Sequence, residues 1–107
     1  MLHDLSKRFR DDQLVRIVDA ATIYMCACPA AVADEVMRLR EVYEYQQNCL
    51  SDGALMEQVH VRIAEATERA HAEMEQCLDD GLRMEGWDRD TLSMPDGLRE
   101  LRNKTLD

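Results

Sequence analysis

The chain has 107 residues, of which 46% are hydrophobic and 33% charged, and its formal net charge is -9. This length allows one domain at most. The acidic balance disfavours nucleic acid and anionic membranes as main partners, since both require concentrated Lys and Arg. Nothing approaches the ~20 apolar residues needed to cross a bilayer, and residues 1–10 lack the apolar run of a secretory signal. We therefore expect a cytoplasmic protein whose four cysteines are reduced.

The apolar residues recur with helical spacing, and no run alternates over the length of a strand. After an arm at residues 1–10, a first helix is expected to begin near Asp11 or Asp12, because acidic side chains suit the positive end of a helix dipole. Pro29 ends it, since the residue before a proline is driven out of the helical region. The same proline can open a second helix that runs to about Leu50.

A turn at residues 51–53 leads into a third, long helix, and Gly81 would end it in the left-handed conformation that glycine favours. The third helix should be roughly 40 Å long at 1.5 Å per residue, and helices two and three are predicted to form an antiparallel hairpin. The apolar line of the third helix is Met56, Val59, Ile63, Ala66, Ala70, Met74 and Cys77. Because helix one is too short to cover the hairpin, we expect a second copy to bury the remainder in a homodimer built from two hairpins.

Residues 82–107 are expected to form a tail that packs on the bundle. The segment 86–95 is typical of an irregular connection, and a short C-terminal helix follows it. Trp87, the only tryptophan, is expected to fix this tail to the bundle, with partner binding as the alternative. The predicted fold is therefore all-α: an elongated three-helix bundle in a single domain, 1–107, with a long antiparallel helical hairpin and a short C-terminal helix.

The acidic excess is concentrated in residues 51–80, which carry eight acidic and two basic side chains. A solvated surface explains such a run. A face that attracts cations or a basic protein partner is the alternative interpretation.

Three cysteines are candidates for a soft-metal site. In a hairpin centred on about Asp52, Cys77 lies level with residue 27, between Cys26 and Cys28. Cys28 also precedes Pro29, where the free N–H groups of a helix start stabilise a thiolate. Three thiolates would suit zinc or copper(I), or could form a redox pair. Ordinary reduced core cysteines are the alternative.

The third helix also carries Glu-x-x-His twice, at residues 57–60 and 68–71. This spacing aims a carboxylate and an imidazole at one ion from one helical face. The hairpin register places Glu35 near Glu68 and His71, and a symmetry mate could complete this cluster as an iron or manganese site. A Glu-rich, solvent-facing helix would produce the same motif by chance.

Tyr45-Gln46-Gln47 followed by Glu68-Arg69-Ala70-His71 resembles the two-helix ferritin-like proteins stored inside encapsulin shells. The resemblance implies an iron site shared between subunits, with a carboxylate from the first helix of the hairpin and the Glu-x-x-His pair from the second. In that alignment Arg38 stands at the position of the first-helix carboxylate, and the N-terminal helix has no counterpart.

Two classes of function follow. The favoured one is a small acidic homodimer that acts as a non-enzymatic interaction or regulatory module, because no glycine-rich phosphate loop or nucleophile motif is present. The alternative is a metal- or thiol-binding protein, holding zinc or copper through the three cysteines or iron through the carboxylates and His71.

Overall fold

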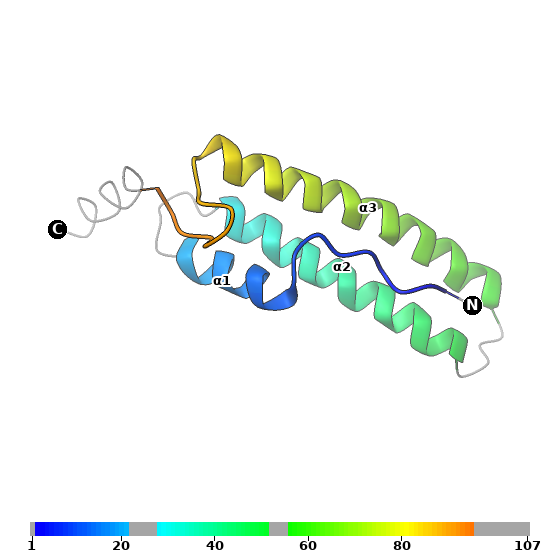
Figure 1. Ribbon diagram of the computed structural model, residues 1–107. Coiled ribbons are helices and arrows are strands. Elements are labelled where there is room, and N and C mark those ends of the chain that lie inside the picture. Colours follow the sequence, from blue (N-terminus) through cyan, green and yellow to red (C-terminus); the bar gives the residue numbers. More distant parts are fainter. Residues whose placement is uncertain (1, 22–27, 52–55, 96–107) are drawn as a thin grey trace.

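The computed structural model describes residues 2–21, 28–51 and 56–95, which form three helices (Figure 1). They are α1, Asp11–Ala21; α2, Cys28–Ser51; and α3, Glu57–Met84. Within these described ranges no strand occurs, so the expected all-α class is confirmed for them. The short helix expected after Pro95 lies outside the described residues.

The start of α1 follows from its capping chemistry. Asp11 and Asp12 lie in the first turn, as predicted. The Gln13 side chain accepts a hydrogen bond from the backbone N–H of Arg10 at 2.8 Å, which is the returning half of a capping box. The predicted end of this helix, before Pro29, falls partly in residues 22–27, outside the described residues.

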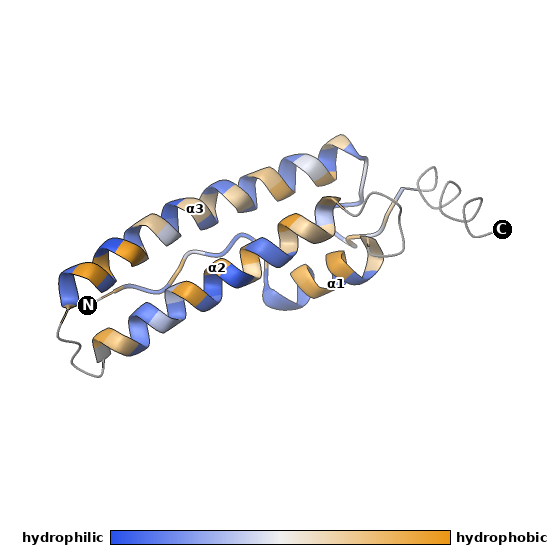
Figure 2. Ribbon diagram, turned by 180° about the vertical axis from the view of Figure 1, so that it is seen from behind, coloured by the Kyte–Doolittle hydropathy of each residue, from blue (hydrophilic) through white to orange (hydrophobic). Residues whose placement is uncertain are grey.

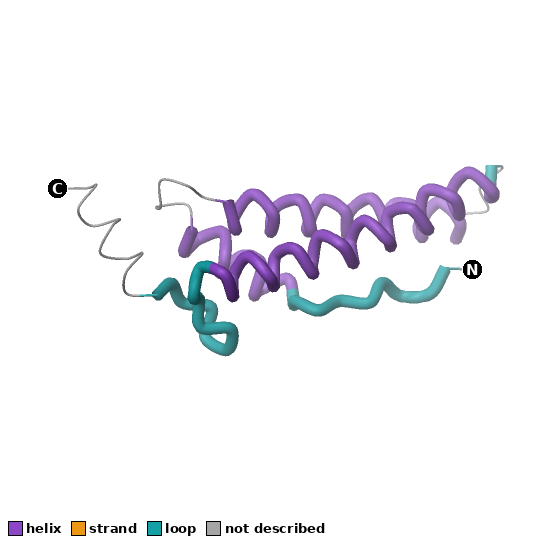
Figure 3. Tube along the Cα trace, turned by 90° about the horizontal axis from the view of Figure 1, so that it is seen from above, coloured by secondary structure: helices purple, strands orange, loops and turns teal. Residues whose placement is uncertain are grey.

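Helices α2 and α3 pack closely along their lengths, and α1 packs on α2 (Figures 1 and 3). Near the end of α2, Gln46 accepts a hydrogen bond from His60, which lies close to the start of α3. Further from that end, Arg40 reaches His71. Along the side of α2 that faces the rest of the molecule, Val36, Tyr43 and Gln46 are all buried.

The predicted end of α3 at Gly81 is wrong, because the helix continues to Met84. The left-handed residue is Gly86 instead, with φ of 81°. The N–H groups of Gly86 and Trp87 bond the carbonyls of Arg83 and Leu82 at 3.0 and 2.9 Å, which completes a Schellman motif. Burial of Leu82 explains the extension, since it outweighs the modest cost of a glycine inside a helix.

Residues 85–95 fold back against the helices, and Trp87 is buried there as a member of the core. Its role in fixing the predicted tail of residues 82–107 stays a prediction. The turn is built by Asp88, whose carboxylate accepts the N–H groups of Asp90 and Thr91. Leu92 takes a positive φ of 56° in this turn and is itself buried.

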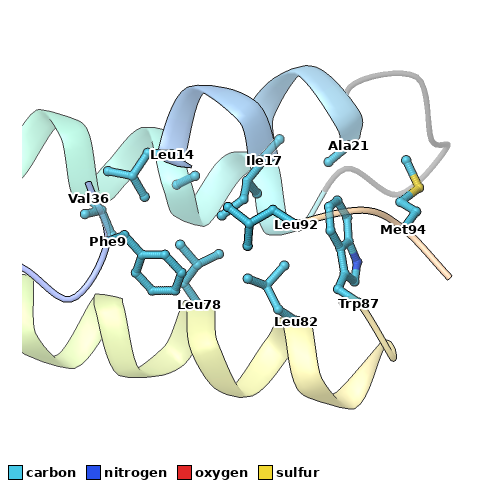
Figure 4. Close-up of a cluster of buried hydrophobic side chains, with 12 residues drawn as sticks. Phe9, Leu14, Ile17, Ala21, Val36, Leu78, Leu82, Trp87, Leu92 and Met94 are labelled. Atoms are coloured by element: carbon cyan, nitrogen blue, oxygen red, sulfur yellow. The ribbon is translucent and has the colours of Figure 1, made fainter. Parts of the chain in front are cut away.

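The apolar core lies where α1, the first half of α2, the second half of α3 and residues 85–95 meet (Figure 4). Its buried members are Phe9, Leu14, Ile17, Ala21, Ala30, Ala33, Val36, Leu78, Leu82, Trp87, Leu92 and Met94. In Figure 4 the Phe9 ring lies beside Leu78, so the end of the N-terminal segment is part of the core.

Residues 2–10, the N-terminal arm, carry no helix and run along α2 and α3 (Figures 1 and 3). Figure 3 shows the arm displaced to one side of the helices. It occupies the surface that a fully helical bundle would cover with another helix.

The apolar line predicted for α3 is largely exposed to solvent. Met56, Val59 and Ile63 are 63%, 45% and 38% exposed, and Ala66 and Ala70 are exposed as well. Figure 2, which views the molecule from behind, shows the hydrophobic segments that recur along this helix. The residues of α3 that are buried instead are Ala64, Thr67, His71, Glu75, Leu78, Asp79 and Leu82.

Candidate functional site

The three cysteines predicted to form a thiol site are only partly described. Cys28 is the first residue of α2 and is exposed, and Cys77 is exposed on α3. Cys26 lies outside the described residues. The thiol site therefore stays a prediction.

The three residues predicted to form a carboxylate and histidine site have different environments. Glu35 is exposed on α2. Glu68 accepts a hydrogen bond from His3 of the arm at 2.8 Å. His71 is only 1% exposed. Across residues 2–21, 28–51 and 56–95, no group of three or more His, Cys, Asp or Glu side chains is placed to hold a metal ion.

The most distinctive polar feature is a buried cluster of Arg40, His71 and Glu75. Arg40 donates from Nε to His71 Nε2 and from Nη2 to Glu75 Oε2, both at 3.0 Å. The same guanidinium also bonds Asp11 Oδ1 at 2.5 Å and the backbone carbonyl of Phe9 at 2.6 Å. Because arginine only donates, the cluster is held together by the four acceptors around this guanidinium.

The contact with Arg40 determines the protonation of His71. An Nε2 atom that accepts a hydrogen bond carries a lone pair, so the proton of the neutral ring is on Nδ1. Nδ1 lies 3.6 Å from Glu75 Oε1, so it faces that carboxylate. Burial lowers the pKa of His71; Glu75 opposes this shift, and the charges of Arg40 and Lys7 add to it. The imidazole is therefore a neutral structural acceptor here.

Glu75 and Arg40 hold the arm mainly through its backbone. The Glu75 carboxylate accepts the N–H groups of Arg8 at 2.8 Å and Phe9 at 3.0 Å. Nearer the start of the arm, Tyr43 donates to the carbonyl of His3 at 2.7 Å. These contacts replace the backbone hydrogen bonds that a helix would have made internally.

A second cluster surrounds Asp79, one turn further along α3. Its carboxylate contacts Arg8 from the arm, Arg83 from α3 and Arg89 from the segment after α3. Burial by itself would raise the pKa of Asp79, but the hydrogen bond from Arg89 and the arginine charges outweigh it and lower the pKa below its usual value. Asp79 thereby joins three parts of the chain.

A groove of about 790 Å3 opens between the arm and α2. The charged side chains that line it are Asp4, Lys7, Asp11, Arg40, Glu41 and Glu44. The carboxylates outnumber the cations, so this groove shares the acidic character of the chain.

The sequence analysis did not predict the two buried clusters, because Glu and His residues on an acidic helix resemble solvent-facing residues. The signal that could have found them is the spacing of His71, Glu75 and Asp79, which repeats every four residues and places all three along one side of a helix. Among the described residues, no helix is long and apolar enough to span a membrane.

No protein-family model, curated protein or solved structure matches this chain. The resemblance to encapsulin-stored ferritin-like proteins therefore stays a prediction.

Proposed function

We propose that this protein is a non-enzymatic interaction module that binds a second copy of itself through one side of α3. We call this side the outer face: Met56, Val59, Ile63, Ala66 and Ala70. The observation that carries the proposal is the exposure of these apolar side chains in a single copy. Water contact with such a stripe is unfavourable by about 25 cal/mol per Å2, and a partner surface would remove it.

The outer face points away from the arm. Three carboxylates of α3 bind the arm: Glu68, Glu75 and Asp79. Each lies nine residues after a member of the outer face, which is Val59, Ala66 or Ala70 respectively. Nine residues are two and a half turns of a helix, so the two sets lie on opposite sides of α3. A partner can therefore dock without displacing the arm.

The order of side chains on the outer face favours a second copy as the partner. Its larger residues, Met56, Val59 and Ile63, come first, and its small residues, Ala66 and Ala70, come last. Two α3 helices in antiparallel contact, centred between Ile63 and Ala66, would place Ile63 opposite Ala66 and Val59 opposite Ala70. A two-fold interface requires self-complementarity of this kind.

The dimer we propose is a bundle of two antiparallel helical hairpins, each made of α2 and α3. The contacts of Gln46 with His60 and of Arg40 with His71 support the antiparallel arrangement within one chain. Val42 and Tyr45 of α2, both exposed, add apolar surface near the same end.

A role other than catalysis is supported by the state of the acid and base groups. His71 and Glu75 are buried at 1% and 3% exposure and are bonded to Arg40 or the arm. A substrate has no access to them in this conformation.

Light scattering coupled to size-exclusion chromatography tests the proposal. The wild-type protein is expected to have twice the chain mass of 12.4 kDa. Ile63→Glu places a charge twice in a symmetric interface, so the dissociation constant should rise by at least about a hundredfold. The variant should elute as a folded monomer with unchanged helical circular dichroism.

Gln58→Glu is the matched control, because it adds the same charge at an exposed position of α3 outside the outer face. It should remain dimeric. A wild-type monomer at about 100 µM, a concentration at which even weak dimers assemble, would refute the proposal.

A further inference from the structure

The far end of α3 carries a cluster of arginines in an otherwise acidic protein. Arg8 Nη1 and Arg83 Nη2 lie 3.2 and 3.3 Å from the same oxygen, Asp79 Oδ2. Arg89 Nε bonds the other carboxylate oxygen at 2.8 Å. Three positive charges therefore meet one negative charge, although the chain as a whole has a net charge of -9.

The three arginines are not equivalent. Arg89 has the shortest contact with Asp79, and its guanidinium carbon stacks 3.9 Å above the centre of the Phe9 ring. Arg8 and Arg83 have longer contacts, and their side chains are 43% and 68% exposed. Their contact with Asp79 uses one terminal nitrogen each, and a guanidinium has five N–H donors.

We propose that Arg8 and Arg83 form a surface site for a phosphate group. Because both nitrogens contact one oxygen atom, they are close enough together for a single tetrahedral oxyanion to contact both. Guanidinium groups bind phosphate through paired, charge-assisted hydrogen bonds. A dianionic phosphate would neutralise the charge that Asp79 leaves uncompensated.

The surroundings of Arg83 are consistent with this role. The carbonyls of Gly81, Leu82 and Arg83 at the end of α3 accept the N–H groups of the following residues. The negative end of the helix is therefore already capped and does not require the Arg83 guanidinium. The neighbouring Asp80 is engaged by the Gln76 amide at 2.8 Å.

The arginine charges also lower the pKa of Asp79, against the opposing effect of its burial. Asp79 therefore stays ionised at neutral pH. Three guanidinium groups thus share the single negative charge of Asp79.

Binding would have a structural consequence, since Arg8 belongs to the arm and Arg83 to α3. A phosphate bridging them would fasten the arm to the helix. Ligand that binds only the folded state raises the unfolding temperature according to its concentration and affinity.

Thermal unfolding in inorganic phosphate, with chloride at equal ionic strength as the reference, tests the site. Phosphate should raise the midpoint of the wild-type protein above that in chloride. In Arg83→Gln the affinity measured by titration calorimetry should fall about tenfold or more, as expected when a charged pair of donors is lost. Arg83→Lys keeps the charge but lacks the planar pair of donors, so its affinity for phosphate should lie between that of Arg83→Gln and that of the wild type.

Arg69→Gln is the matched control, because Arg69 is also exposed on α3 but lies away from Asp79. It should bind phosphate as the wild type does. The inference is overturned if phosphate stabilises the wild type no more than chloride, or if Arg83→Gln retains wild-type affinity.

A capped phosphoserine tripeptide and its unphosphorylated form distinguish the source of the phosphate group. Tighter binding of the phosphopeptide than of inorganic phosphate would indicate a phosphorylated protein segment. Equal or weaker binding would indicate the free anion. No response to either phosphate-bearing probe would refute the site.

Discussion

The chemistry of His71 depends on which of its nitrogens faces Arg40. Nε2 accepts from the guanidinium, so a second proton on the ring would replace an attractive contact with the repulsion of two cations. The sequence predicted a metal ligand or a solvent-facing residue at this position. Neither interpretation could foresee the contact, because Arg40 is 31 residues away and Phe9, which shares the same guanidinium, is in the arm.

Stability is expected to fall with acidification because the pKa of His71 is lowered in the folded protein by burial and by its cationic neighbours. The unfolded chain, with a value near 6.5, then binds more protons as the pH falls below about 6.5. The contribution of His71 is complete above that pH and is lost progressively below it. Urea midpoints measured from pH 8 down to pH 5 should decrease over the acidic part of the range.

His71→Gln is the comparison, because an amide oxygen can accept from Arg40 but does not titrate in this range. Its midpoint should depend less on pH than that of the wild type. The same pH dependence in both proteins would show that another group is responsible.

At the scale of the elements, local chemistry predicted where helices begin better than where they end. Asp11 and Pro29 act within their own turn, and α1 and α2 begin where those residues predict. The end of α3 depends instead on the burial of Leu82 and Trp87, which requires contacts from distant segments. The sequence analysis also failed to predict which side of α3 is buried. That side carries polar residues such as Glu75 and Asp79, whose partners lie in the distant arm.

The two glycines near the end of α3 should respond oppositely to substitution by alanine. At Gly81 an added Cβ would meet nothing within 4 Å, so Gly81→Ala should stabilise the helix by about 0.5–1 kcal/mol. At Gly86 the backbone has φ of 81°, so Gly86→Ala should destabilise the protein by about 1–2 kcal/mol.

Urea unfolding of both variants measures these changes. Crowding does not complicate the second one, because the nearest atom to the added Cβ of residue 86 is in Pro95, at 3.8 Å. Stabilisation by Gly86→Ala would show that this helix ends differently in solution.

For the whole molecule, net charge and exposed apolar surface have opposite effects on the proposed dimerisation. The proposed dimer brings together two chains that each carry a net charge of -9, while the outer face supplies apolar area to be buried. Repulsion between like-charged proteins weakens as salt shortens the distance over which charges interact.

The dimer dissociation constant should therefore decrease when NaCl is raised from about 20 mM to about 300 mM, because the screening length shortens over this range. Sedimentation equilibrium at the two salt concentrations measures the change. An increase in the dissociation constant would show that ion pairs across the interface, rather than the outer face, hold the two copies together.

The attachment of the arm also affects the order in which this protein can acquire its structure during synthesis. Arg8 and Phe9 leave the ribosome early, but their partners Glu75, Asp79 and Arg89 are translated more than sixty positions later. At roughly 5–20 residues per second, the first segment waits for several seconds without its binding surface. A nascent chain in which Glu75 has not yet emerged would therefore expose an unattached, protease-accessible N-terminal segment, and its protection would appear only once Glu75 has left the ribosome.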